Sequence, residues 1–284
     1  MRPQHIKDLL LGALDDNPLL ISITELMNLL LRGDTPSSVR NVLFGANLLA
    51  IRKKTGGVRP IAVDYVWRRL AAKEACNHIK KTSATLLAPR QLGFGIAGGA
   101  EVAVRAARIY VDSMQHGQVF IKIDFKNAFN TLRRDSILEA VAKHFPELLP
   151  FAQSTIGEIS SLQFGDFVLQ SEEGAQQGDP LEPLYFCLAF KKLLESLRCE
   201  LVLGYLDDVT IGGEATCVLK DFIQLELAAR KIGLEINYNK CEIVGHTDDS
   251  RSLFASSGIN LPETTCRGVI AACSCELSYR LQRL

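Results

Sequence analysis

Hydrophobic residues in the first 44 positions repeat at helical spacing. A capping box, Ser22-Ile-Thr-Glu25, precedes the apolar run Leu26–Leu31, and Gly33 stands where a helix C-cap belongs. A second, shorter helix is predicted from Ser37 to Phe44. We therefore expect residues 1–44 to form a helical lead-in without a chemical role.

The pattern changes to β-prone runs after this lead-in. Leu48–Ile51 and Val58–Val63 flank the turn sequence Thr55-Gly56-Gly57, which predicts a hairpin. Lys53 and Arg59 lie at or near its tip, so the hairpin would present basic side chains. A helix that carries apolar residues at helical spacing is expected to follow.

From Val119 onward, strands and helices with distinct start and stop signals follow one another. The predicted elements are a strand at 119–124, a helix with the capping box Ser136-Ile-Leu-Glu139, an apolar helix opened by Asp179-Pro180, a β-hairpin at 201–211, a helix at about 216–232 and a strand at 234–244. This order favours an antiparallel sheet covered on one face by helices, an α+β fold. Periodicity is lost from Thr247 onward.

Composition describes a folded chain with no large charge bias. The 284 residues are 47% hydrophobic and carry 32 basic and 32 acidic side chains, a balance that does not favour nucleic acid. Nine basic residues nevertheless lie between Arg52 and Lys81 against two acidic ones, a pattern typical of a solvated face. The eight cysteines contain no CxxC pair and are interpreted as free thiols. Neither a membrane span nor a signal peptide is predicted.

Three aspartates interrupt apolar runs where a carboxylate is energetically expensive. Asp124 ends one predicted strand, and Asp207-Asp208 lie at the centre of a predicted hairpin. If the two strands are neighbours, Asp124 and Asp207 can face one site from the same sheet surface, and two or three such carboxylates can bind a pair of Mg²⁺ ions. Adjacent strand residues point to opposite faces, so the role of Asp208 is less defined. The alternative interpretation is a polar hairpin turn.

Six segments, in order, resemble motifs of the reverse transcriptase family, most closely its non-LTR (LINE-like) retrotransposon branch. They are Lys53 with Gly56 and Arg59-Pro-Ile61; Gln91-Leu-Gly-Phe94 through Gly98-Gly-Ala-Glu101; Asp124-Phe-Lys-Asn-Ala-Phe-Asn130; Gly174-Ala-Gln-Gln-Gly-Asp-Pro-Leu181; Tyr205-Leu-Asp-Asp208; and Gly233-Leu-Glu-Ile-Asn237 with Lys240. The resemblance covers about residues 45–245. It implies an RNA-directed DNA polymerase, a nucleotidyltransferase, with a right-hand palm and fingers.

The resemblance also implies roles for individual residues. Asp124 and Asp207, assisted by Asp208, would bind two Mg²⁺ ions, with Mn²⁺ as a substitute, and Lys240 would act as general acid toward pyrophosphate. The nucleotide-binding residues would be Lys53 and Arg59 at the triphosphate, Phe125 through its backbone, Phe129 against a ribose 2′-hydroxyl, and Gln177 and Gly178 at the incoming nucleotide and template base. The implied partners are an RNA template, a DNA primer and dNTPs, with no membrane.

The same resemblance predicts the domain organisation. We expect a lead-in at 1–44, fingers and the fingers–palm junction at 45–118, a palm at 119–246 and a degenerate tail at 247–284. Thr265-Cys-Arg-Gly-Val-Ile270 is a worn form of the family's primer-gripping hairpin, so the thumb is expected to be absent or truncated. Thumb and endonuclease modules would belong to a longer product. An intracellular location is expected, with nucleus and cytoplasm both open.

Two other classes of protein compete with this interpretation. A catalytically silent retroelement fragment, or an RNA-binding relic, would keep the palm fold and hold template without the aspartates. A different palm enzyme, such as a nucleotide cyclase, lacks the Gln-Gly-Asp-Pro-Leu helix entry found at 177–181. Metal binding by the aspartates discriminates the polymerase from the silent fragment.

Overall fold

The computed structural model describes residues 3–12, 14, 16–52, 56–245 and 248–264. The chain divides into two compact units, each built from two separate stretches of sequence. The first unit combines residues 1–79 with 133–185, and the second combines 80–132 with 186–284. Two helices, α4 (Val66–Leu87) and α9 (Glu182–Ser196), begin in the first unit and continue into the second.

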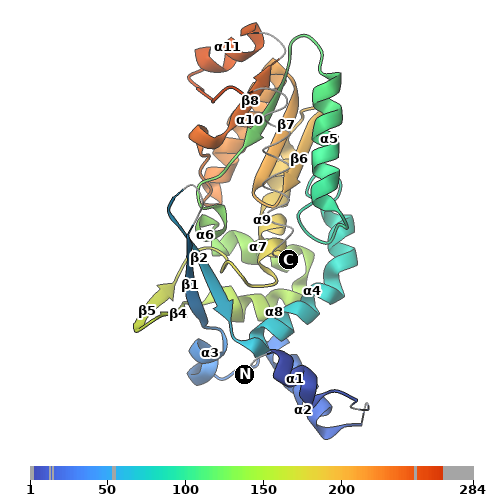
Figure 1. Cartoon of the computed structure of the whole chain (residues 1–284), viewed down its shortest axis with the longest axis vertical. Helices are drawn as coiled ribbons and strands as arrows, with labels where there is room; N and C mark the ends of the chain where they lie inside the picture. The colour runs from blue at the N-terminus through green and yellow to red at the C-terminus, as the bar shows by residue number, and fades with distance from the viewer. Residues whose placement is uncertain (1–2, 13, 15, 53–55, 246–247, 265–284) are drawn as a thin grey trace. The chain divides into compact units, whose positions relative to one another are not determined.

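The first unit contains a four-stranded sheet of order β2-β1-β4-β5 (Figure 1). Its strands are β1 (Ala46–Arg52), β2 (Val58–Asp64), β4 (Ser160–Phe164) and β5 (Phe167–Ser171). β1 and β2 pair antiparallel along their whole length, which confirms the hairpin predicted from the turn sequence. β1 also pairs briefly in parallel with β4, and this pairing joins two segments more than 100 residues apart in sequence.

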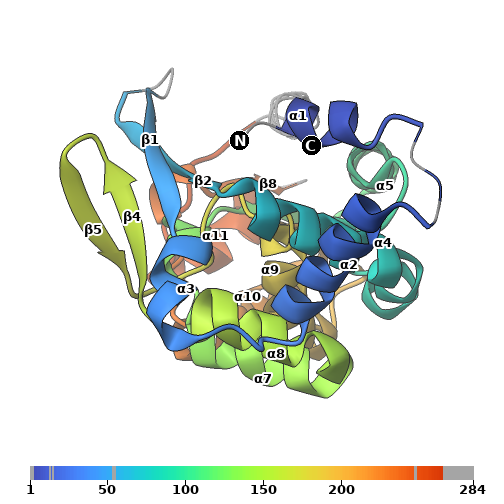
Figure 2. The same cartoon turned by 90° about the horizontal axis from the view of Figure 1, so that it is seen from below.

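The first unit also contains several helices, one of which, α3 (Ser37–Leu43), contacts β4 (Figure 2). They are α1 (Pro3–Leu9), α2 (Pro18–Leu31), α3, α7 (Arg134–His144) and α8 (Leu149–Ala152), with a 3-10 turn at Pro146–Leu148 and a π-helical turn at Gln153–Gly157. α2 packs on α8. The rings of Phe44 and Phe151 meet edge to face with centroids 6.2 Å apart. These aromatic rings and the buried Leu30 form part of the apolar core of the unit.

Both predicted capping boxes are wrong, although the helices they were meant to start are present. α2 begins four residues earlier, at Pro18, because Asn17 accepts a hydrogen bond from the Leu19 amide (2.9 Å) and proline suits the first turn. Ser22 therefore lies inside the helix, where its hydroxyl donates to the Pro18 carbonyl. α7 likewise begins before Ser136. The predicted C-cap at Gly33 is confirmed by its left-handed φ of 71°.

An antiparallel sheet of order β6-β7-β3-β8 forms the core of the second unit. Its strands are β3 (Gln118–Ile123), β6 (Leu201–Tyr205), β7 (Asp208–Glu214) and β8 (Glu242–Gly245). Besides the later parts of α4 and α9, this unit contains the helices α5 (Gly99–Ser113), α6 (Ala128–Thr131), α10 (Ala215–Lys231) and α11 (Asp248–Ser256). α5 contacts β6, while α10 contacts β3 and β7 (Figure 1). Ile121, Val209 and Ile211 are fully buried at the centre.

Two predictions about the end of this unit need correction. The strand expected at 234–244 is reduced to β8, and Lys240 lies in a 3-10 turn, Tyr238–Lys240. The reason is tertiary: the Asn237 amide donates to the Asp124 carbonyl (2.8 Å), and the amides of Lys240 and Cys241 turn back onto the Asn237 carbonyl. Helix α11 also forms beyond Thr247, where the periodicity suggested no element.

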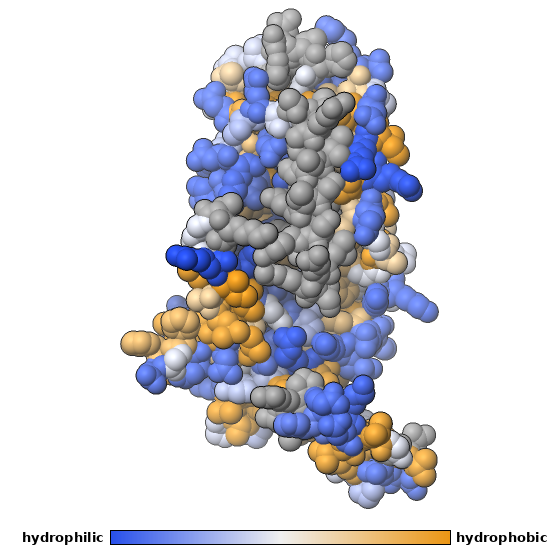
Figure 3. All heavy atoms as spheres, in the orientation of Figure 1, coloured by the Kyte–Doolittle hydropathy of each residue, from blue (hydrophilic) through white to orange (hydrophobic). Residues whose placement is uncertain are grey.

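Exposed apolar side chains gather over the strands of the first unit (Figure 3). Phe167, Val168 and Leu169 are consecutive residues of β5, and all three are exposed. β5 is an edge strand of its sheet, and its successive residues, which point to opposite faces, are exposed alike. Among the described residues, no helix is both long and apolar enough to cross a membrane.

Candidate active site

Asp124 and Asp208 stand at the same end of two paired strands. β3 and β7 are antiparallel neighbours, with Ile123 opposite Val209. Asp124 directly follows Ile123, and Asp208 directly precedes Val209. Asp207 lies in the turn that joins β6 to β7. The three carboxylates therefore gather where these neighbouring strands end, and all are partly exposed to solvent.

The segment after α10 fixes the position of Asp124. Asn237 donates from Nδ2 to Asp124 Oδ2 at 3.1 Å and from its backbone amide to the Asp124 carbonyl. Lys240 Nζ is 4.0 Å from the same Oδ2, with 21% of the Asp124 side chain exposed against 65% of Lys240. A carboxylate with this much solvent access keeps room for a cation, while the mostly exposed Lys240 contributes little to stability. The structure thus brings Lys240 close to Asp124.

The turn that carries Asp207 has an unusual backbone. Tyr205 pairs with Asp208, so Leu206 and Asp207 form a two-residue turn, and Leu206 has a left-handed φ of 57°. That conformation usually takes glycine, and a leucine adopts it at a cost of roughly 1–2 kcal/mol. Surrounding contacts must therefore hold this turn in place.

The side chain of Gln91 supplies those contacts. Its Oε1 accepts hydrogen bonds from the Leu206 and Gly93 amides, both at 2.9 Å, and its Nε2 donates to the Leu206 carbonyl at 3.1 Å. Gln91 is 1% exposed, so water cannot replace these bonds. A Cβ on Gly93 would come within 2.5 Å of the Leu206 nitrogen. The Gln91-Leu-Gly sequence thus stabilises the turn that carries Asp207, a role that its motif resemblance did not reveal.

Replacing Gln91 by leucine is expected to lower the free energy of unfolding by about 2 kcal/mol or more. The reason is that two buried amide donors and one carbonyl would lose their partner. Urea unfolding of the chain measures this loss. Gln224→Leu, at an exposed position of α10, is the matched control and should change stability by less than about 0.5 kcal/mol. Equal effects of the two substitutions would show that the hydrogen bonds of Gln91 do not stabilise the turn.

Two aromatic residues that follow Asp124 in the chain pack against rings of α9. Phe125 meets Phe190 edge to face at 5.5 Å, and Phe129 lies 4.7 Å from Phe186 in a tilted arrangement. All four rings are buried, with Phe129 at 8% exposure. Phe129 is therefore part of the palm core. Contact with a ribose is an additional role that remains a prediction.

In the first unit, Gln177 and Gly178 lie against strand β2. The Gln177 carbonyl accepts from the Ala62 amide at 2.7 Å. Gly178 has a φ of 120°, and a Cβ there would be 2.3 Å from the Ala62 carbonyl oxygen. Glycine is therefore required at this position, and the close approach is to the protein's own backbone. Arg59 lies on β2, opposite Ile51, and Lys53 lies outside the described residues.

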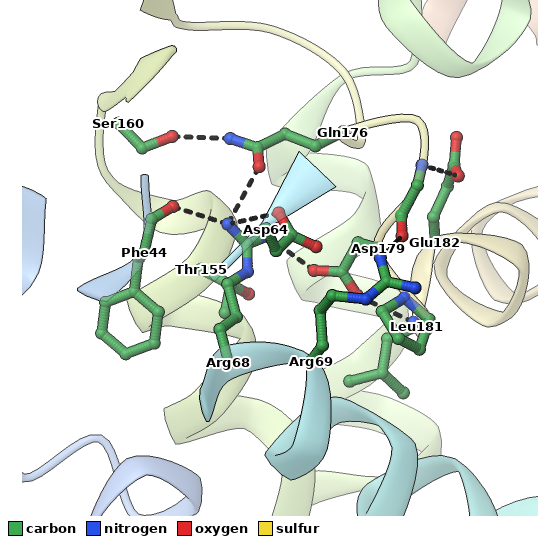
Figure 4. Close-up of polar contacts among 12 residues, drawn as sticks. Phe44, Asp64, Arg68, Arg69, Thr155, Ser160, Gln176, Asp179, Leu181 and Glu182 are labelled. Carbon is green, nitrogen blue, oxygen red and sulfur yellow. Dashed lines mark hydrogen bonds and ion pairs between the residues drawn. The ribbon is translucent and has the colours of Figure 1, made fainter. Parts of the chain in front are cut away.

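A buried guanidinium holds this loop (Figure 4). Arg68 is 1% exposed and donates to Asp179 (2.6 Å), to the Gln176 side chain (2.9 Å) and to the Phe44 carbonyl (2.6 Å). It also forms an ion pair with Asp64 at 3.3 Å. Asp179 uses its other oxygen to accept from the Leu181 amide, so it holds the turn before α9, which begins at Glu182 and not at Pro180 as the sequence predicted. Arg68 belongs to the basic run that was interpreted as a solvated face, and for this residue that interpretation is wrong.

Asp64 gives this cluster a pH dependence. Burial raises the pKa of Asp64 from 3.8 to about 7, although Arg68 opposes the shift. Between about pH 4 and pH 7 the folded chain binds a proton that the unfolded chain has released, so the free energy of unfolding should fall as pH rises, by up to about 1.4 kcal/mol per pH unit. Urea unfolding across this window should show a flatter slope for Asp64→Asn. Asp34→Asn, at an exposed position, should keep the parent slope.

Metal-ligand geometry distinguishes the palm carboxylates from another cluster. Among described residues, the one group of three or more ligand atoms lying within 4.8 Å of one another is formed by Cys199, Cys217 and Asp221. Asp124, Asp207 and Asp208 do not form so tight a group. Their donor atoms are all carboxylate oxygens, the chemistry that Mg²⁺ prefers. They therefore fit a hard divalent cation by ligand type.

An α+β fold with three carboxylates gathered where neighbouring strands of an antiparallel sheet end is typical of polymerases built from a palm and fingers. The sequence pattern of "Reverse transcriptase (RNA-dependent DNA polymerase)" matches residues 51–256, and the chain belongs to that family. The predicted recognition as a reverse transcriptase domain of a non-LTR retrotransposon is confirmed by this match and by its relatives. The family uses divalent metal ions and copies RNA.

Two curated relatives come from retrotransposable elements. The chain is 28% identical over 255 residues to the retrotransposable element SLACS 132 kDa protein of Trypanosoma brucei gambiense, covering 86% of this chain and 21% of that protein. It is 28% identical over 244 residues to the retrovirus-related Pol polyprotein from type-2 retrotransposable element R2DM of Drosophila melanogaster, covering 78% of this chain and 23% of that protein. The chain thus spans about a fifth of the length of these relatives.

Solved telomerases share the fold. Apo telomerase from Candida tropicalis, truncated from its C-terminal domain, aligns with a TM-score of 0.53 at 15% identity, over 72% of this chain and 51% of that one. Telomerase from Candida albicans in complex with a TWJ fragment of telomeric RNA aligns with a TM-score of 0.56 at 10% identity, over 75% and 43%. These likenesses confirm the fold class.

Proposed function

We propose that this chain is the polymerase core of a retrotransposon reverse transcriptase, which extends a DNA primer on an RNA template with dNTPs. Family membership and the meeting of Asp124 with the Asp207-Asp208 turn at one sheet edge support this proposal. The single observation that carries it is the β3–β7 register, because it places acids from distant motifs beside each other.

The proposed reaction is a phosphoryl transfer. The primer 3′-oxygen forms a bond to the α-phosphorus of the dNTP, the bond to pyrophosphate breaks, and the hydroxyl proton is released. Two bound Mg²⁺ ions, or Mn²⁺ in their place, would stabilise the attacking and leaving oxygens. Asp124 and Asp207 would hold them, with Asp208 assisting.

Other side chains have proposed supporting roles. Lys240 would donate a proton to the pyrophosphate, and its position 4.0 Å from the Asp124 carboxylate is consistent with that work. Phe125 would contact the triphosphate through its backbone, and the ring of the buried Phe129 would exclude a ribose 2′-hydroxyl. Lys53 and Arg59 would contact the triphosphate, and Gln177 and Gly178 the nucleotide and template base. In Gln177, the buried Oε1 has no hydrogen-bond partner among the described residues, so it is available to a ligand.

Primer extension tests the proposal. The chain is incubated with an RNA template, an annealed DNA primer, dNTPs and Mg²⁺, and compared with Asp207→Ala. Extension by the parent chain and its loss in the variant would establish a polymerase core. A folded chain that binds template equally well with and without the aspartate, and extends no primer, would instead be a silent RNA-binding fragment.

A further inference from the structure

Cys199, Cys217 and Asp221 form a compact cluster of metal-ligating side chains in the second unit. One ligand atom from each lies within 4.8 Å of the others. Cys217 and Asp221 are one turn apart on α10, and Cys199 lies in the connection between α9 and β6. Helix geometry places residues i and i+4 on the same face, so α10 presents both ligands to that connection. Along the chain, Cys217 lies 18 residues after Cys199, and Asp221 lies four residues after Cys217. The cluster therefore contains no CxxC motif.

The Asp221 carboxylate is held in place from one side. Its Oδ2 accepts hydrogen bonds from the backbone amides of Arg198 (2.6 Å) and Cys199 (2.7 Å), and Oδ1 takes part in neither bond. Hydrogen bonds of this kind orient metal-ligating carboxylates in proteins. They also fix the Cys199 backbone relative to α10, so two of the three ligands are already positioned.

Asp221 is also a buried acid that lacks a cationic partner. It is 3% exposed, and within the described part of the chain no basic side chain lies within 4.0 Å of its carboxylate. A buried carboxylate without a cation is energetically unfavourable, and coordination to a metal is one way to compensate it. Cys199 is equally buried, and Cys217 is half-buried and gives the cluster access to solvent.

The donor set selects the kind of metal. Two sulfur atoms and one carboxylate oxygen suit Zn²⁺, whose bonds are about 2.3 Å to sulfur and about 2.0–2.2 Å to oxygen, and do not suit Mg²⁺. Ligand atoms within 4.8 Å of one another need only a small contraction to surround one such ion. A water molecule would complete the tetrahedron. This chemistry differs from the all-oxygen donor set of Asp124, Asp207 and Asp208.

We propose that Cys199, Cys217 and Asp221 bind one Zn²⁺ ion that ties α10 to the α9–β6 connection. The site is structural, and it is independent of the polymerase activity.

Titration of the full chain with Cd²⁺ under reducing conditions tests the site, because Cd²⁺ reports thiolate ligands by ultraviolet charge-transfer absorption. We expect one Cd²⁺ to bind, to be displaced by Zn²⁺, and to raise the midpoint of thermal unfolding. Cys217→Ser, at a half-buried position that should tolerate the change, is expected to remove most of the absorption and weaken binding at least about 10-fold. Asp221→Asn should weaken binding while keeping the thiolate signal.

Control variants separate this cluster from the other cysteines. Cys76→Ser, whose thiol bonds to the Pro180 carbonyl, and a triple serine variant of Cys266, Cys273 and Cys275 should leave the titration unchanged. Persistence of the signal in Cys217→Ser, its loss in the triple variant, or the absence of any thiolate band in the folded parent chain would each overturn the proposal. All these readouts are independent of primer extension.

Discussion

Asparagine in place of Asp124 is expected to reduce primer extension by at least about 10³-fold while leaving the fold intact. Asparagine can still accept the hydrogen bond from Asn237, which is 3.1 Å long in the native chain. It loses the negative charge that would hold the metal, and with it several kcal/mol of transition-state stabilisation, where each 1.36 kcal/mol corresponds to about tenfold in rate. Single-nucleotide extension at saturating Mg²⁺ measures the change.

The control for this substitution lies on the same unit. Asp112→Asn removes an exposed carboxylate from α5 and should retain extension within about twofold. Thermal unfolding of both variants should agree with the parent chain within a few degrees. Retention of substantial extension by Asp124→Asn would show that the palm carboxylates are not the metal ligands, even if the family assignment stands.

Methionine in place of Arg68 is expected to lower the free energy of unfolding by about 3–5 kcal/mol. Removal of one partner from a buried ion pair leaves an uncompensated charge, and here Asp64 and Asp179 both lose their partner. Because small domains are stable by only about 5–15 kcal/mol, much of the chain's stability would be lost. Urea unfolding at pH 7.5 and pH 5 should show a smaller loss at the lower pH, where Asp64 is protonated.

A neighbouring arginine provides the matched comparison. Arg69 is half-buried and donates one hydrogen bond to the Gly178 carbonyl at 2.7 Å, so Arg69→Met should cost about 1–2 kcal/mol. Asp64→Asn combined with Arg68→Met should recover part of the loss, because one of the two stranded carboxylates is removed. Equal costs of Arg68→Met and Arg69→Met at both pH values would show that the buried charge cluster is not a stabilising feature.

Much of the local structure could be predicted because its causes are local. The 46–64 hairpin follows from two β-prone runs around a glycine turn, and the hairpin of Tyr205 to Asp208 follows from apolar runs around an acidic centre. Helix ends were less predictable. Ser22-Ile-Thr-Glu25 has the pattern of a capping box, yet Asn17 and Pro18 start the helix earlier. Two valid start signals compete there, and the one nearer the N-terminus adds a full turn.

The residues of the candidate site were likewise only partly predictable from the sequence. Order and spacing of six motifs indicated the family and the residues Asp124, Asp207 and Asp208, and the strand register then brought these acids to one edge. The residue-level roles remain predictions. Gln91 and Arg68 were missed as positioning residues, since their partners lie more than 100 residues away in the chain. A glutamine in a motif and an arginine in a basic run carry no local sign of burial.

The sequence by itself determined the α+β class, most of the helices and hairpins, and membership of the reverse transcriptase family. These features depend on periodicity, turn residues and the order of short motifs, all of which are written along the chain. Tertiary structure decided which polar groups are buried together. It placed Arg68 between Asp64 and Asp179, Gln91 under the turn of Leu206, and Cys199 beside α10. Burial and pairing depend on which distant segments meet, and only the folded backbone specifies that.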